Sequence, residues 1–145
     1  MFERLPGIDP AKRREVAARW LDRPGRATDA AERDRLVAEA LTVMEAPDYA
    51  GFFLPDALAE APIAATVDGR VVQGTVDRLL VQPDLVRLVD FKTGMRVPSS
   101  AEAAPTYHLR QMAAYAAALA RGFPDRRVGA ALVYTAGPRP LVLPP

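Results

Sequence analysis

The stretch that decides the fold is residues 71–93, VVQGTVDRLLVQPDLVRLVDFKT. Apolar and polar residues alternate on both sides of Gln82-Pro83-Asp84-Leu85. Proline presets φ at the second position of a turn, and aspartate suits the position after it. The pattern therefore predicts two antiparallel strands joined by a tight turn.

The hairpin also predicts a cluster of charged side chains. A hairpin symmetric about its turn places Asp77 opposite Asp90 and Thr75 opposite Lys92, with opposite Cβ atoms about 4.5–5.5 Å apart. Lys92 follows Asp90 by two residues and projects from the same face. Two carboxylates at that distance repel unless a cation lies between them. We therefore predict a metal site, the alternative being an ion pair of Lys92 with either acid on an open strand.

Composition narrows the class of protein. The 145 residues, 50% of them hydrophobic and 26% charged, suffice for one domain with its own core. The absence of cysteine excludes disulfides, zinc–thiolate sites and iron–sulfur clusters, and agrees with a cytoplasmic protein. No apolar run approaches the roughly 20 residues of a membrane helix, and the N-terminus has no apolar signal core. The net charge of +1 does not by itself indicate nucleic-acid binding.

Periodicity and caps predict the remaining elements. Helices are expected over 9–22 and 29–46, each beginning at an aspartate, Asp9 or Asp29. The first of them is basic, which indicates either a solvated face or contact with phosphates. Further segments are a short helical turn within 47–59 covering the sheet edge, a strand over 59–69, a loop over 94–106, a helix over 107–123, a buried strand over 128–135 and a short strand near 140–143. This order predicts an α/β fold, a central mixed sheet with helices on both sides.

The last predicted helix has an apolar stripe that should face inward. Its members are Leu109, Met112, Ala113, Ala116 and Leu119. His108, the only histidine, is expected at the surface or against a loop, with an approach to the charged cluster as the alternative.

Three short segments resemble the motifs of a known family. GTVD (74–77), VDFKT (89–93) and QMAAY (111–115) resemble, in order and spacing, the G-x-x-D, D-x-K and Q-x-x-x-Y motifs of RecB-type nucleases in the PD-(D/E)xK superfamily. The surrounding residues, from about 56 to 143, resemble most closely the C-terminal nuclease domains of AddA-type helicase–nucleases. The resemblance implies a restriction-endonuclease-like core.

The resemblance also implies roles for individual residues. Asp77 and Asp90, with the Phe91 carbonyl oxygen, would bind Mg²⁺ or Mn²⁺, and Lys92 would hold the attacking water or stabilise the transition state. Glu60 matches an acidic position that either assists the metal or simply begins a solvated strand. Gln111 and Tyr115 would brace the site or touch the DNA backbone, the alternative being a polar cap on a core helix.

The function implied is that of a metal-dependent DNA exonuclease acting in double-strand break repair and recombination. We expect one nuclease domain over residues 1–145, with N-terminal helices at about 9–46 and a catalytic core at about 56–143, as a fragment of a larger helicase–nuclease. Its partners would be DNA, an upstream helicase region and a subunit of AddB type, with no membrane. No G-x-x-x-x-G-K-[ST] motif is present, so no ATP site of that type is expected.

One departure of the sequence from the family's motifs leaves other functions possible. The family carries a histidine before its G-x-x-D motif, and none precedes Asp77. A catalytically inactive module of the same fold, used for DNA binding or subunit docking, is the main alternative. A stand-alone restriction-type endonuclease is a weaker one.

Overall fold

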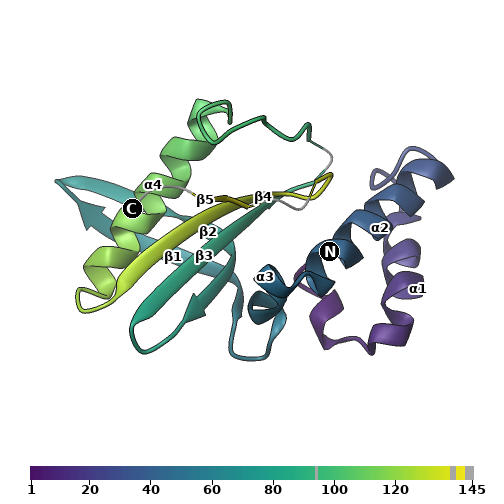
Figure 1. The fold of residues 1–145 in the computed structure, drawn as a ribbon, viewed down its shortest axis with the longest axis horizontal. Coiled ribbons are helices and arrows are strands. Elements are labelled where there is room, and N and C mark those ends of the chain that lie inside the picture. Colours follow the sequence, from purple (N-terminus) through teal and green to yellow (C-terminus); the bar gives the residue numbers. More distant parts are fainter. Residues whose placement is uncertain (94, 138–139, 143–145) are drawn as a thin grey trace.

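The computed structural model describes residues 1–93, 95–137 and 140–142, and Figure 1 shows its arrangement. The helices are α1 (Pro10–Leu21), α2 (Ala30–Glu45), α3 (Pro47–Ala50) and α4 (Thr106–Gly122), with 3₁₀ turns η1 (Leu5–Gly7) and η2 (Gly51–Phe53). The strands are β1 (Leu58–Val67), β2 (Arg70–Val81), β3 (Leu85–Lys92), β4 (Arg127–Tyr134) and β5 (Pro140–Val142). They form one sheet in the order β1-β2-β3-β4-β5, in which only the β3–β4 pair is parallel. The predicted mixed α/β sheet is confirmed.

The two N-terminal helices begin at the predicted aspartates. Asp9 accepts a hydrogen bond from the Ala11 amide at 3.0 Å, and Asp29 accepts one from the Glu32 amide at 2.8 Å. These bonds satisfy amides that the first turn of a helix leaves unpaired. The helices pack on each other through their own apolar cluster, which lies beside the sheet rather than across it (Figure 1).

Helix α4 connects the parallel strands β3 and β4 and covers one face of the sheet (Figure 1). Of the predicted inward stripe, Met112 and Leu119 are buried and Leu109 and Ala116 pack against the same core, whereas Ala113 is exposed. The buried positions of α4 are His108, Met112, Tyr115, Ala118 and Leu119. Tyr115 and His108 are buried in addition to the predicted stripe, since Tyr115 packs against Gly74 of β2 and His108 lies beside the Tyr134 hydroxyl of β4.

The opposite face of the sheet is covered by α3 and η2. Tyr49 and Phe52 pack with Val43 of α2 on Val89 and Phe91 of β3 and on Ala131 and Val133 of β4. These strands lie inside the sheet, so the prediction that this segment covers the sheet edge is wrong. The small side chains of β4 leave room for the aromatic rings to lie over the middle of the sheet.

The central hairpin has the predicted turn and register, but its ladder ends early. The Gln82 amide donates to the Leu85 carbonyl at 2.9 Å, and the pairs run from Val81↔Val86 to Arg78↔Val89. The next pair in that register, Asp77 with Asp90, is not part of the ladder, and neither is Thr75 with Lys92. Beyond Val89, β3 keeps its pairing with β4 while β2 separates from it. The prediction that Asp77 pairs with Asp90 and Thr75 with Lys92 is therefore wrong, because β2 and β3 separate before they reach these residues.

No helix in the described part of the chain is both long enough and apolar enough to cross a membrane.

Candidate active site

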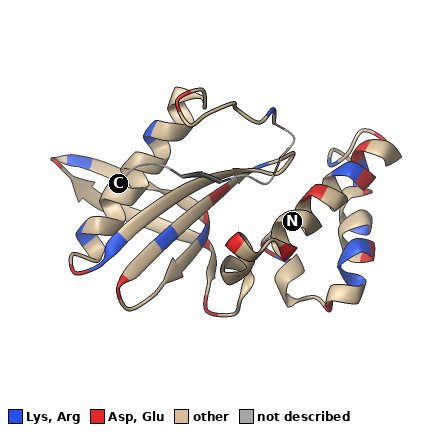
Figure 2. Ribbon diagram, in the orientation of Figure 1, with Lys and Arg blue, Asp and Glu red and all other residues tan. Residues whose placement is uncertain are grey.

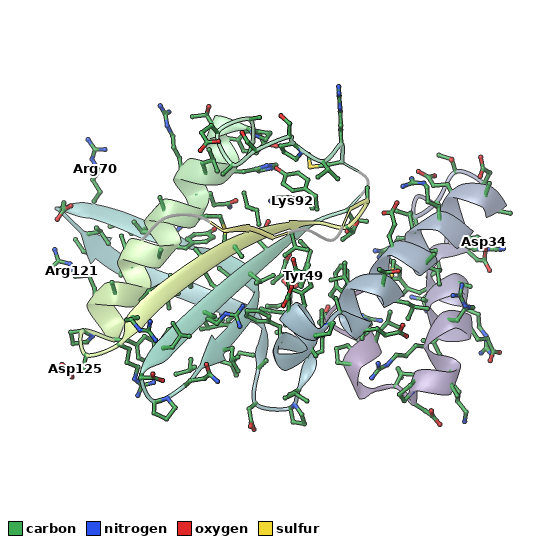
Figure 3. The ribbon with its side chains drawn as sticks, viewed as in Figure 1. Asp34, Tyr49, Arg70, Lys92, Arg121 and Asp125 are labelled. Carbon is green, nitrogen blue, oxygen red and sulfur yellow. The ribbon has the colours of Figure 1, made fainter. Side chains whose placement is uncertain are left out.

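Asp90 and Lys92 lie on one face of β3 and form an ion pair between Asp90 Oδ2 and Lys92 Nζ. Their side chains are only 13% and 16% exposed, so this pair is mostly withdrawn from solvent. Lys92 lies at the end of β3, where the chain leaves the sheet (Figure 3). The sequence-based alternative of an Asp90–Lys92 ion pair is thus present, but on a largely buried strand rather than an open one.

Asp77 joins this pair through the backbone of β3. Its Oδ2 accepts a hydrogen bond of 2.6 Å from the Phe91 amide. Because β2 and β3 no longer pair at this level, a carboxylate oxygen of Asp77 takes the place of a ladder carbonyl. The bond fixes the Asp77 side chain against the peptide that links the other acid to Phe91.

The surroundings of Asp77 disfavour the ionised form of its carboxyl group. Burial raises the pKa of Asp77 to about 6, and the neighbouring Asp90 and Glu60 charges act in the same direction. The Phe91 amide and the Lys92 ammonium oppose this increase in pKa. A cation bound beside Asp77 would favour the ionised form of this carboxyl group, which burial disfavours.

A pocket of about 200 Å³ opens beside Asp77. Its lining comes from four parts of the chain and comprises Met1, Phe2, Glu3, Glu60, Asp77, Phe91 and Thr93. Glu60 is exposed and has a left-handed φ of 48°. Its place opposite Asp77 is omitted from the β1–β2 ladder, which has Ala59↔Arg78 and Ala61↔Val76 on either side. Strand β1 therefore bends at the level of the acids.

A larger cavity of about 410 Å³ lies between α3 and strands β3 and β4. It is lined by Asp48, Tyr49 and Arg87 among others, and contains none of the motif residues. Of the motif residues, Asp77, Phe91 and Thr93 line the smaller pocket, whereas Asp90 and Lys92 belong to the lining of neither cavity.

Gln111 and Tyr115 meet each other on α4. Gln111 Nε2 donates to the Tyr115 hydroxyl at 3.2 Å, and Tyr115 is buried whereas Gln111 is exposed. A Cβ atom placed on Gly74 would lie 1.9 Å from that hydroxyl. The first and third motifs are therefore in contact, and Tyr115 braces β2 from inside the core. Of these two residues, only Gln111 is accessible to a ligand.

His108 is buried, not at the surface. It is 3% exposed, and its Nδ1 lies 3.3 Å from the hydroxyl of Tyr134, the residue beside Lys92 in the β3–β4 register. The pKa of His108 is lowered, mainly by burial and secondarily by the Lys92 charge. The sequence prediction was wrong because the first turn of α4 lies over the end of β4. In the sequence, the apolar run 128–135 ends in the polar residues Tyr134 and Thr135, and these residues could have indicated a hydrogen-bond partner for His108.

The described residues supply few metal ligands. In ranges 1–93, 95–137 and 140–142, no group of three or more His, Cys, Asp or Glu side chains is placed to hold a metal ion. Asp77 and Asp90, together with backbone oxygen, are the donors that the arrangement offers. Asp90 Oδ2 is buried and has no well-directed hydrogen bond from any described residue, although the Lys92 ammonium lies beside it. Such a carboxylate oxygen fits a hard divalent cation of the Mg²⁺ type.

A mixed sheet flanked by helices, with two acids and a lysine where its central strands part, defines a restriction-endonuclease-like protein. Comparison with known protein families matches residues 3–140 to the PD-(D/E)XK nuclease superfamily, and the chain belongs to that superfamily. Members of this superfamily hydrolyse phosphodiester bonds and generally use divalent metals. A search of curated proteins gave no match.

Proposed function

We propose that this chain is a Mg²⁺-dependent deoxyribonuclease domain. The observation that carries the proposal is the bond from the Phe91 amide to Asp77, which ties that carboxylate to the strand bearing Asp90 and Lys92. Two acids and an ammonium are thereby held in one rigid unit, and this matches the reaction class of the superfamily.

Each residue has a distinct part in the proposed chemistry. Asp77, Asp90 and the Phe91 carbonyl oxygen would hold the ion, and Glu60, which lines the same pocket as Asp77, would act through the water around it. A bound divalent ion supplies an activated water and neutralises charge on the phosphate. Lys92, now paired with Asp90, would turn to the non-bridging phosphate oxygen or the attacking water. Gln111 is exposed on α4 and able to contact the nucleic-acid backbone, while Tyr115 supports β2.

The proposed setting is a larger helicase–nuclease of AddA type that acts as an exonuclease in double-strand break repair and recombination. The support is the order and spacing of the motifs GTVD, VDFKT and QMAAY. In this setting the domain works in the cytoplasm beside a helicase region and a subunit of AddB type.

A second candidate is a catalytically inactive module of the same fold that binds DNA or docks a subunit. Two observations favour it. Lys92 and Asp90 already satisfy each other as an ion pair, and the described residues contain no third side-chain ligand beside Asp77 and Asp90.

Cleavage of linear DNA by the wild-type protein and by Asp90→Ala and Lys92→Ala variants tests the first candidate. Each variant should lower the Mg²⁺-dependent rate at least about 100-fold, with an unchanged far-ultraviolet circular dichroism spectrum. Asp84→Ala is the matched control, since Asp84 lies at the exposed tip of the same hairpin. Undiminished cleavage in both variants overturns the nuclease assignment. Tight DNA binding without cleavage and without Mn²⁺ binding supports the inactive module instead.

A further inference from the structure

Arg78 is an arginine in the interior of the protein, only 4% exposed. Its guanidinium donates from Nη2 to the Phe2 carbonyl and, at 3.5 Å, from Nη1 to the Ala57 carbonyl. Among the described residues it has no carboxylate partner within salt-bridge distance, and its Nε has no hydrogen-bond acceptor. Burying a charged group with so few partners is costly. The two hydrogen bonds of Arg78 therefore indicate the structural role of this buried charge.

These contacts form part of a closed ring around the candidate site. Arg78 binds the backbone of Phe2, and the Phe2 ring stacks on the Phe91 ring with centroids 4.2 Å apart. The Phe91 amide donates to Asp77, and Asp77 is the residue before Arg78 in β2. The ring thus runs through one covalent link, two hydrogen bonds and one aromatic stack.

We propose that Arg78 is a positioning residue that closes this ring and so fixes the Phe91 peptide and the Asp77 carboxylate for the metal. The proposal rests on the function proposed above. Since β2 and β3 do not pair at this level, no ladder bond holds Phe91 toward β2. Instead, Phe91 is held by the stack of its ring on Phe2 and by the hydrogen bond from its amide to Asp77. Arg78 in turn holds Phe2 in place through the Phe2 carbonyl oxygen.

The geometry requires arginine rather than another cation. Two carbonyl oxygens from distant parts of the chain, Phe2 and Ala57, are reached by two nitrogens of one planar guanidinium. The guanidinium also lies over the Phe53 ring, 5.5 Å from its centroid. A lysine would supply one compact ammonium and lose the forked arrangement.

The first experiment needs no metal. Amide hydrogen exchange of Phe91, followed by nuclear magnetic resonance in EDTA, reports the bond to Asp77 directly. Arg78→Met should speed this exchange about fivefold to tenfold relative to the amides of β4, and Arg78→Lys should recover only part of the protection. Arg87→Met is the matched control, because Arg87 is a strand arginine over the Phe52 ring at 4.8 Å but outside the ring of contacts. Should Arg78→Met fail to fold, Phe2→Leu tests the same closed set of contacts without removing the buried charge of Arg78.

The second experiment measures Mn²⁺ affinity by calorimetry. Arg78→Met and Phe2→Leu should each weaken binding about 10- to 100-fold, and their effects should be less than additive because both open the same ring. Wild-type affinity and unchanged Phe91 exchange in both variants overturn this inference while leaving the nuclease proposal intact. Failure of the wild-type protein to bind Mn²⁺ refutes the proposed function, and faster Phe91 exchange in the variants would then still establish the ring as a structural clamp.

Discussion

Gly74 and Tyr115 occupy adjoining space, although 40 residues separate them in the sequence. A side chain at position 74 would collide with the tyrosine ring, since the added Cβ would lie within 3 Å of three of its atoms. The glycine of the first motif is therefore required by packing against α4.

Gly74→Ala should destabilise the protein by about 1–3 kcal/mol through overpacking. In a Tyr115→Leu background, whose shorter side chain leaves room for the new methyl group, the same substitution should cost clearly less. Gly129→Ala is the matched control, because the nearest atom to its added Cβ lies 3.9 Å away. Urea denaturation measures all of these variants, and equal costs in the two backgrounds would contradict the collision.

Asp77 gives a pH dependence of stability in metal-free protein. Burial raises its pKa from 3.8 to about 6, so the folded state binds its proton more tightly than the unfolded state. The stability that Asp77 contributes is thus present below about pH 4 and is lost as pH rises through 6. The free energy of unfolding of wild type minus that of Asp77→Asn should fall by about 1–2 kcal/mol between pH 4 and pH 7, allowing for partial solvent screening.

Urea titrations in EDTA at both pH values measure this difference. Asp56→Asn, at an exposed loop aspartate, reports the general effect of pH on a surface carboxylate. A difference that grows between pH 4 and pH 7 has the opposite sign and would refute the assignment.

At the scale of elements, the local rules predicted most of the fold. Helix caps at Asp9 and Asp29 and the turn at Pro83-Asp84 are short-range features, and the structure contains each of them. The structure adds a second tight turn, at Asp68-Gly69 between β1 and β2. The Asp68 and Gly69 φ angles of 49° and 76° are those of a two-residue hairpin loop. What failed were predictions that depend on a second element: the exposure of His108 on α4, the cover over the sheet, and the pairs at the end of the ladder.

Asp29→Ala should cost about 1 kcal/mol, because the Glu32 amide at the start of α2 loses its acceptor. Asp29→Asn keeps an oxygen in the same place and should retain most of the stability. Thermal unfolding of the two variants compares them directly, and equal losses would show that charge, not the cap, is responsible.

At the scale of the whole molecule, charge is mixed rather than gathered into one patch. Basic and acidic residues are mixed along α2, whereas α1 is predominantly basic (Figure 2), and several charges are paired with each other, as in Arg33–Asp22 and Arg35–Glu39. In the basic N-terminal segment, Arg19 pairs with the exposed Glu15, and Arg13 donates to the Pro6 and Ile8 carbonyl oxygens. These contacts favour the solvated-face interpretation of that segment over phosphate contact. A hydrogen bond of 3.2 Å from Thr135 Oγ1, just after β4, to Glu39 of α2 links these helices to the edge of the core.

Metal binding should stabilise the whole fold, because the donor set exists only when β2 and β3 are assembled. A divalent ion at ten times its dissociation constant adds about 1.4 kcal/mol to the free energy of unfolding, which raises Tm by roughly 3–6 °C for a domain of this size. Mn²⁺ should produce this shift in the wild-type protein, and NaCl of matched ionic strength should not. An equal shift in Asp90→Ala would show that the ion binds elsewhere.

The sequence by itself determined the strand pattern, the turns and the caps, and it singled out Asp77, Asp90 and Lys92 as the candidate site residues. These follow from local spacing, because neighbours along a strand or helix have fixed relative directions. Only the tertiary structure decided that β2 separates from β3 at the acids, that the Phe91 amide compensates there, and that His108 and Arg78 are buried. Those outcomes depend on how α4 and the N-terminal residues pack on the sheet, and packing between distant segments leaves no periodic signal in the chain.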